Sequence, residues 1–230
     1  MNKKFIEFLV RNSVLKFGDF TLKSGRKSPY FINTGVLNSG VSSYELGVFF
    51  AKKIAKIFGS DFDTIYGPAY KGIPLAVSVS IGLYKKMKMM DKSWLFDRKE
   101  TKEYADKNAF VGDGPRDGQK IIMVDDVFTT GGTKDESIKK LKAAANIDIR
   151  GIVIAVDREE KGAKNNVRER KGAIAEFEAS SGIRVYAVEK ISNIFKYLYN
   201  REINGKIYVD DKIFAASEEY LQQYGADAYE

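Results

Sequence analysis

Short apolar segments alternate with helical segments through the middle of this chain, and this alternation limits the fold more than any other feature. Apolar runs at residues 64–66, 93–96, 120–124, 149–156 and 184–188 each predict a strand. The segments between most of them carry helical apolar spacing or helix-capping residues. Strands that alternate with helices predict an α/β fold with a mostly parallel central sheet and helices on both faces. Because such sheets bind ligands beyond the carboxyl ends of their strands, we expect functional residues in the loops that follow.

The two ends of the chain differ from this pattern. Residues 3–15 have apolar residues at near-helical spacing, whereas residues 17–35 combine aromatic residues with turn formers around Ser24 and Gly25. The second segment predicts a small N-terminal hood of short strands. We expect a single domain over residues 1–230, with the N-terminal helix and hood at about 1–40, the core at about 41–190 and C-terminal helices at about 191–230.

Two core helices are located by capping boxes, in which a Ser or Thr N-cap is followed three residues later by Glu. Ser42 to Glu45 and Thr133 to Glu136 have this pattern, so we expect helices to begin there. Pro74 is expected near the start of another helix, where its missing N–H does little harm. Residues 97–118 are polar, charged and contain glycine, and they predict a long loop.

The chain contains no histidine and no cysteine. These absences exclude a disulfide framework, thiolate or imidazole metal ligands, a cysteine nucleophile and a Ser-His-Asp triad. Any acid–base chemistry must therefore fall to Asp, Glu, Lys or Tyr.

The formal net charge of +7 leaves two interpretations open. The basic residues bind nucleic acid, or they gather at one site that takes polyanionic substrates. The longest apolar stretch, about residues 73–84, is too short for a membrane span, and Glu7 and Arg11 interrupt any signal-peptide core. We expect a cytoplasmic location and no membrane partner.

The segment IIMVDDVFTTGGTKDES, residues 121–137, carries the most chemistry. A buried strand runs into two adjacent carboxylates, and a loop of threonines and glycines leads into a capped helix. Glycines let backbone N–H groups turn toward an anion, and the helix N-terminus adds partial positive charge. The carboxylates suit sugar hydroxyls or the waters of a magnesium ion. The segment predicts a site for a ribose that carries a 5-phosphate.

Other interpretations of this region are weaker. An acidic turn before a capped helix would explain a lone Asp-Asp pair, but not the whole string of residues. A Walker A loop requires G-x-x-x-x-G-K-[ST], which the chain lacks. Residues 112–118, GDGPRDG, have the wrong spacing for a dinucleotide fingerprint and precede a strand instead of following one.

The segment at 121–137 resembles the phosphoribosyl-diphosphate (PRPP) motif of type I phosphoribosyltransferases. Further stretches resemble one branch, the orotate phosphoribosyltransferases. They are FTLKSGRKSPYFIN (20–33), YGPAYKGIPLA (66–76), FDRKETKEY (96–104) and VDREEKG (156–162). Order and spacing agree from about residue 5 to about residue 200.

This resemblance implies transfer of the 5-phosphoribosyl group from PRPP to orotate, giving orotidine 5′-phosphate and pyrophosphate with Mg²⁺, in pyrimidine nucleotide synthesis. It also implies a homodimer in which the loop at 97–118 reaches the neighbouring active site. No protein residue is assigned as a certain metal ligand, because PRPP and water near Asp125 and Asp126 are expected to hold the ion. No nucleic-acid partner is expected.

The resemblance also assigns site residues by position. Lys102, Asp125 and Asp126 are implied as catalytic, with Lys102 the catalytic lysine of the loop. Phe31, Ile32, Thr129 and Arg158 are implied to bind orotate, and Arg158 suits its carboxylate. The residues implied to bind PRPP are Lys23, Tyr70, Lys71, Arg98, Lys99, Lys102, Tyr104, Asp125, Asp126, Val127, Phe128, Thr129, Thr130, Gly131, Gly132 and Thr133.

One position departs from the family pattern. Two residues after the loop lysine the family usually has a histidine followed by glycines, and here Tyr104 is followed by Ala105-Asp106-Lys107-Asn108. Tyrosine donates a hydrogen bond but carries no positive charge at neutral pH. We therefore expect activity without a titration near neutral pH from this position.

The sequence leaves two alternative functions open. A purine phosphoribosyltransferase would share residues 121–137 but not 20–33 or the surroundings of Arg158. A non-enzymatic PRPP-binding regulator would use the positive charge for nucleic acid, although no added DNA-binding module is recognisable.

Overall fold

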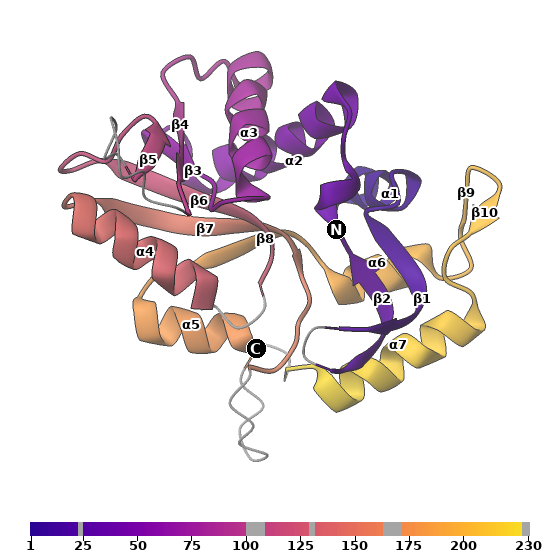
Figure 1. Cartoon of the computed structure of the whole chain (residues 1–230). Coiled ribbons are helices and arrows are strands. Elements are labelled where there is room, and N and C mark those ends of the chain that lie inside the picture. Colours follow the sequence, from indigo (N-terminus) through magenta and orange to yellow (C-terminus); the bar gives the residue numbers. More distant parts are fainter. Residues whose placement is uncertain (23–24, 100–108, 129–131, 163–171, 227–230) are drawn as a thin grey trace.

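The computed structural model of the chain describes residues 1–22, 25–99, 109–128, 132–162 and 172–226 (Figure 1). At its centre is a six-stranded sheet in the order β5–β4–β3–β6–β7–β8. All neighbours are parallel except β5, which runs antiparallel to β4 at one edge. The strands are β3 (Thr64–Tyr66), β4 (Ser93–Asp97), β5 (Phe110–Gly112), β6 (Lys120–Val127), β7 (Asp148–Asp157) and β8 (Val185–Lys190). The predicted fold class is confirmed.

Helices cover both faces of this sheet. The side chains of its central strands point alternately to one face and the other, and both sets are apolar and must be buried. Figure 1 shows α2 (Gly40–Phe58) and α3 (Gly72–Met87) above the sheet, and α4 (Gly132–Ala144) and α5 (Ala173–Ser181) below it. Ile122 and Val124 of β6 join the core under α2 and α3. Met123 joins the second core, against α4 and α5.

A smaller layer is built from the two ends of the chain. The predicted hood is the antiparallel pair β1 (Leu15–Thr21) and β2 (Lys27–Ile32), followed by a 3-10 turn η1 (Thr34–Val36). Around it lie α1 (Lys3–Arg11), α6 (Ile191–Leu198) and α7 (Asp211–Tyr224), to the right of the sheet in Figure 1. The ring of Tyr30 on β2 packs edge-on against Phe195 of α6 and Tyr220 of α7.

Several elements differ from the sequence predictions. Strand β5 lies within the predicted loop at 97–118, and the hairpin of β9 (Glu202–Ile203) and β10 (Lys206–Ile207) lies within the predicted helical end. These strands have two or three residues, too few for a recognisable period. Helix α2 begins one turn before the predicted box, because Ser39 is the N-cap and accepts from the Ser42 amide.

Strand β6 is longer than the predicted run to Val124. Asp125 pairs with Ile154 of β7, and Val127 pairs with Val156, so both acids still belong to the strand. Helix α4 begins at Gly132, one residue before the predicted N-cap Thr133. None of the helices in the described part of the chain has the length and apolarity needed to cross a membrane.

Candidate active site

The predicted ribose-phosphate segment lies where strand β6 ends and helix α4 begins. Asp125 to Val127 form the last residues of β6, and Gly132 and Thr133 form the first turn of α4. The side chain of Phe128 is buried and packs against Phe177 of α5, so a ligand would meet its backbone. This position, at the carboxyl end of a central parallel strand, is the one at which α/β sheets bind ligands.

The two neighbouring acids face different cations. Asp125 pairs with the Nζ of Lys134, which also donates to the carbonyl of Val127 at 2.9 Å. Lys134 is buried, and its Nζ lies 5.4 Å from the centre of the Phe128 ring. Burial raises the pKa of Asp125, and the adjacent Asp126 carboxylate raises it further, although Lys134 opposes both. Asp125 is therefore a buried carboxylate that is paired with Lys134 at the inner end of the site.

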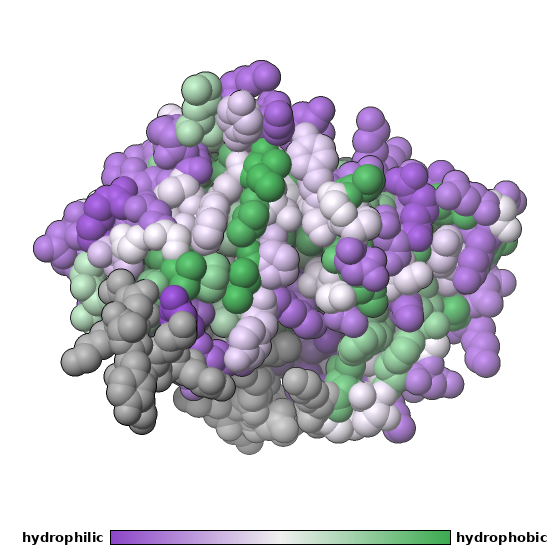
Figure 2. Space-filling view, turned by 45° about the horizontal axis from the view of Figure 1, so that its top comes forward, coloured by the Kyte–Doolittle hydropathy of each residue, from purple (hydrophilic) through white to green (hydrophobic). Residues whose placement is uncertain are grey.

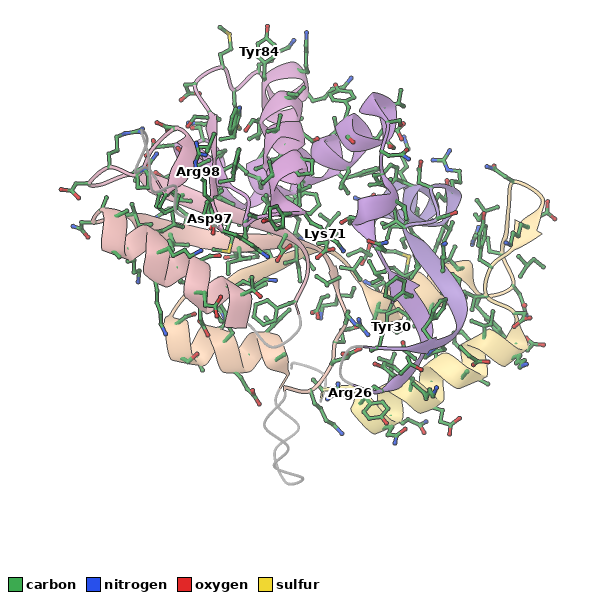
Figure 3. The ribbon with its side chains drawn as sticks, viewed as in Figure 1. Arg26, Tyr30, Lys71, Tyr84, Asp97 and Arg98 are labelled. Atoms are coloured by element: carbon green, nitrogen blue, oxygen red, sulfur yellow. The ribbon has the colours of Figure 1, made fainter. Side chains whose placement is uncertain are left out.

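Asp126 joins three separate segments of the chain. Its Oδ2 lies 3.3 Å from the Nζ of Lys71 and accepts from the Thr34 hydroxyl at 3.2 Å. Lys71 also donates to the side-chain oxygen of Asn33 at 3.1 Å. Figure 3 shows Lys71 near the centre of the molecule, between the sheet and the hood. The end of the hood, the loop after β3 and the end of β6 thus meet at one carboxylate.

The loops after β3 and β4 bring further predicted residues together. The Nζ of Lys99 lies 4.7 Å from the ring centre of Tyr70, which is well exposed. The peptide bond before Tyr70, from Ala69, is cis. The amide of Arg98 donates to the carbonyl of Ala109 at 2.7 Å, which continues the pairing of β4 with the chain that returns as β5.

Asp97 at the end of β4 organises these loops, although its side chain is buried. It accepts hydrogen bonds from the Tyr66 hydroxyl at 2.9 Å, the Ala69 amide at 3.0 Å and the Lys140 ammonium at 2.9 Å. Burial alone would raise the pKa of Asp97, but the bonds from Lys140, Ala69 and Tyr66 outweigh burial and lower it. Asp97 therefore fixes the loop before Lys71 against β4 and α4.

The residues predicted to bind the base lie on β2 and beyond β7. Phe31 is 40% exposed and its ring stacks on Phe20, whereas Ile32 is 7% exposed and belongs to the core. Arg158 follows β7 and is 8% exposed. Its Nε and Nη2 donate to Glu160 at 2.9 and 2.6 Å, and its guanidinium carbon lies 5.1 Å from the Tyr30 ring centre.

A cavity of about 90 Å³ opens beside Arg158. Arg158, Glu160, Asp157 and Lys190 line it, together with Phe128 from the phosphate segment. Burial raises the pKa of Asp157, and Glu159 and Glu160 add to the rise, against the hydrogen bond from the Glu159 amide and the charge of Lys190. Arg158 thus faces a small cavity, lined by charged and apolar side chains, that reaches Phe128 just after β6.

Several predicted residues cannot be located in this way. They lie outside the described residues and are Lys23, Lys102, Tyr104, Thr129, Thr130 and Gly131. Conversely, the site also contains four residues that no sequence pattern marks, which are Lys134, Asp97, Asn33 and Thr34. A lysine in the first turn of a helix and an acid at the end of a strand are usually solvated, so pattern alone gave no signal for them.

The described residues offer a limited set of metal ligands. Within them, no three Asp or Glu side chains gather closely enough to hold a metal ion on their own. Asp125 and Asp126 supply two carboxylates at the ribose-phosphate segment. This donor set fits a divalent cation held mainly by substrate oxygens and water, as magnesium commonly is.

Comparison with known proteins gives consistent matches along the chain. A profile of the phosphoribosyl transferase domain matches residues 44–179. An orotate phosphoribosyltransferase of Agathobacter rectalis is 42% identical over 223 residues, 96% of either chain. One of Bifidobacterium adolescentis is 44% identical over 232 aligned positions, 98% of either chain. The crystal structure of the Francisella tularensis orotate phosphoribosyltransferase superposes with a TM-score of 0.80 at 38% identity, covering 97% of this chain and all of that one.

Proposed function

Because the chain belongs to the phosphoribosyltransferase family and, within it, to the orotate phosphoribosyltransferases, we propose how its residues divide the work of that reaction. The reaction joins orotate to the ribose of PRPP and expels pyrophosphate, giving orotidine 5′-phosphate in pyrimidine nucleotide synthesis. This assignment of roles rests on one observation. The end of β6, the Lys71 loop and the end of the hood converge on Asp126. The sugar, the leaving group and the base are then served by different segments.

The sugar phosphate is held at the end of β6 and the start of α4. The N-terminus of α4 suits the 5-phosphate, since its first amides lack helical partners. Threonine hydroxyls and glycine amides of residues 129–133 complete the phosphate site. Asp125 and Asp126 accept from the ribose hydroxyls, and Lys71 and Lys134 hold the two carboxylates apart.

The leaving pyrophosphate gathers negative charge as the reaction proceeds, so cations that meet it stabilise the transition state more than the substrate. Lys71, Arg98 and Lys99 lie on the two loops beside β3 and β4. Tyr70, which is exposed next to Lys99, supplies a further contact. Lys23, Lys102 and Tyr104 complete this set. Lys102 is the catalytic lysine of a loop that closes over the site and excludes water.

Orotate occupies the space between β2 and the segment after β7. Phe31 offers an exposed aromatic face, Ile32 contributes through the backbone of β2, and Thr129 adds a hydroxyl. Arg158 pairs with the carboxylate of the base. A buried arginine that meets a planar carboxylate selects orotate over bases that lack the group.

Magnesium is the proposed cofactor. When bound with PRPP it neutralises charge on the pyrophosphate oxygens, which makes the group easier to expel. Asp125 and Asp126 would orient the waters of the ion, which substrate oxygens and water would hold.

We further propose a homodimer in the cytoplasm. In support of the dimer, Figure 2 shows an apolar stripe over α3 on the face turned toward the viewer. Ile73, Val77, Ile81 and Tyr84 follow one side of this helix, and the last two are 45% and 48% exposed. Such a stripe is typical of a protein–protein interface. It begins next to the Lys71 loop, so a second copy seated there would lie beside the site.

The catalytic assignment is tested with Lys102→Ala. The purified protein should consume orotate only when PRPP and Mg²⁺ are both present, and should release one pyrophosphate per orotate. Lys102→Ala should lower kcat by about a hundredfold or more, the usual range for a charged group acting in the transition state, with little change in PRPP binding. Lys142→Ala, an exposed lysine at the far end of α4, is the control. Full turnover by Lys102→Ala would refute the assignment.

A further inference from the structure

The guanidinium of Arg158 is held by groups that lie far apart in the sequence. Nε and Nη2 both donate to Oε1 of Glu160, at 2.9 and 2.6 Å. The guanidinium carbon stands 5.1 Å from the ring centre of Tyr30, a fully buried residue of β2. Since Arg158 itself is nearly buried, these contacts fix its orientation more than water does.

Glu160 is in turn held by the C-terminal helix. Its Oε1 accepts from the Tyr220 hydroxyl at 2.7 Å and from the Tyr30 hydroxyl at 3.3 Å. Arg26 lies 3.5 Å from the other oxygen. Burial and the neighbouring Glu160 raise the pKa of Tyr220 to about 12, so its hydroxyl keeps the proton and donates at neutral pH.

Helix α7 is fixed in the place that this contact requires. The ring of Tyr220 packs edge-on against Tyr30, with ring centres 5.7 Å apart. Backbone hydrogen bonds tie the end of the helix to the segment that carries Glu160: Lys161 donates to Tyr224 at 2.9 Å, and Ala226 donates to Glu159 at 2.8 Å. Figure 3 shows Arg26 and Tyr30 near α7, where the guanidinium of Arg26 lies 5.0 Å from the ring centre of Tyr224. The cavity beside Arg158 is lined by Ala226 as well.

We propose that α7 is a positioning element for the base half of the site, in which Tyr220 acts through Glu160 to aim Arg158 at the carboxylate of orotate. This rests on the proposed function, because it takes Arg158 as the partner of that carboxylate. Glu160 occupies the Nε–Nη2 edge of the guanidinium and turns the Nη1 side toward the substrate. The sugar half is built on β6, α4 and Lys71 instead, so α7 governs recognition of the base and not of PRPP.

The test is the variant Tyr220→Phe, which removes one hydroxyl and keeps the packed ring. The KM for orotate should rise about three- to tenfold, the worth of one ordinary hydrogen bond, because Tyr220 acts on Arg158 only through Glu160. kcat, the KM for PRPP and Tm should stay close to those of the wild type. Tyr199→Phe is the matched control, because it removes a 2.8 Å tyrosine bond to Asp211 at the other end of α7. Its KM for orotate should not change.

Arg158→Ala separates failure of the inference from failure of the proposed function. If wild-type protein does not consume orotate, the proposed function is wrong and the inference is lost with it. If Arg158→Ala raises the KM for orotate and Tyr220→Phe adds nothing in that background, Tyr220 acts through Arg158, as proposed. Two results would overturn the positioning role and leave the function standing, provided that Arg158→Ala raises the KM for orotate. In the first, Tyr220→Phe leaves the KM for orotate unchanged. In the second, Tyr220→Phe raises the KM values for orotate and PRPP equally and lowers Tm.

Discussion

Lys134 is a buried lysine that holds the ribose-phosphate segment. Its ammonium meets the Asp125 carboxylate and the Val127 carbonyl, in surroundings that leave both charged groups with little water. Removing one partner of a buried ion pair leaves the other charge uncompensated. The pair therefore holds Asp125 in place, and the stability of the segment depends on Lys134.

Lys134→Met tests this dependence. The free energy of unfolding at pH 7 should fall by about 3 kcal/mol, measured by urea denaturation. Because Asp125 already has a raised pKa, it takes up a proton readily without its partner, so the loss should shrink as the pH falls toward 4. Lys134→Met with Asp125→Asn should recover part of the loss. A single variant as stable as the wild type at pH 7 would show that the pair contributes nothing.

At the residue scale the sequence located the two acids but not their partners. Asp125 and Asp126 could be placed because an apolar run leads straight into them and a helix follows. The spacing of Lys134 is that of any solvated lysine, and Thr34 and Asn33 reach Asp126 only through tertiary packing. Arg158 and Glu160 are only two residues apart in the sequence. The hydroxyls of Tyr30 and Tyr220, which donate to Glu160, come from distant elements and have no sequence signal.

At the element scale, Asp97 ties β4 to Tyr66 of β3, to the loop at Ala69 and to Lys140 of α4. Its pKa in the folded protein lies below the ordinary value, chiefly because Lys140 and the two other donors outweigh burial. The stability that Asp97 contributes is therefore fully present above about pH 4, the unfolded value. It is lost as the pH falls through the folded-state pKa.

Asp97→Asn checks the sign of this dependence. The variant should be less stable than the wild type at pH 6, because the amide pairs weakly with Lys140. The difference in urea midpoint between the wild type and the variant should narrow below about pH 4, because the wild-type carboxylate then takes up a proton and loses its charge. A difference that stays constant from pH 6 to pH 3 would mean that ionisation of Asp97 does not stabilise the fold.

Helices α2 and α3 approach each other through glycines. A Cβ on Gly47 would lie 2.1 Å from the carbonyl oxygen of Ser78, and one on Gly82 would lie 2.8 Å from the Gly47 carbonyl oxygen. Both contacts are with backbone atoms, which cannot move aside as a flexible side chain would. Close packing of these helices therefore requires glycine, and α3 in turn begins directly after Lys71.

Gly47→Ala should lower the free energy of unfolding by about 1–3 kcal/mol, the usual cost of overpacking, with a matching fall in Tm. Gly40→Ala is the matched control, because Gly40 lies on the same helix and a Cβ there would meet nothing within 4 Å. It should be neutral or slightly stabilising, since alanine favours the helix by about 1 kcal/mol. Equal effects of the two substitutions would refute the close-packing account.

The elements themselves were largely predictable from the sequence. Five strands and the principal helices follow from apolar runs and periods, because burial on both faces of a parallel sheet requires them. The edge strand β5 and the hairpin of β9 and β10 were missed, since pairing of so few residues is decided by their neighbours. The N-cap of α2 was misplaced by one turn because Ser39 and Ser42 offer the same capping chemistry.

For the molecule as a whole, the apolar stripe on α3 lies exposed on the face that Figure 2 shows, and it is the proposed dimer interface. If two copies meet there, Ile81→Lys should place a charge in the interface and shift the protein from dimer to monomer, measured by size-exclusion chromatography with light scattering. Ile207→Lys, an equally exposed isoleucine on β10, is the control and should stay dimeric. A dimer that survives Ile81→Lys would locate the interface elsewhere.

The proposed function requires that one site join a ribose-phosphate half around Asp125 and Asp126 to a base half that accepts orotate. The most direct measurement gives the protein PRPP, Mg²⁺ and equal amounts of orotate, adenine, guanine and hypoxanthine, and identifies the nucleotide formed by mass. Orotidine 5′-phosphate should be the product, with loss of one orotate for each pyrophosphate released. A purine nucleotide, or binding of PRPP with no base consumed, would contradict it.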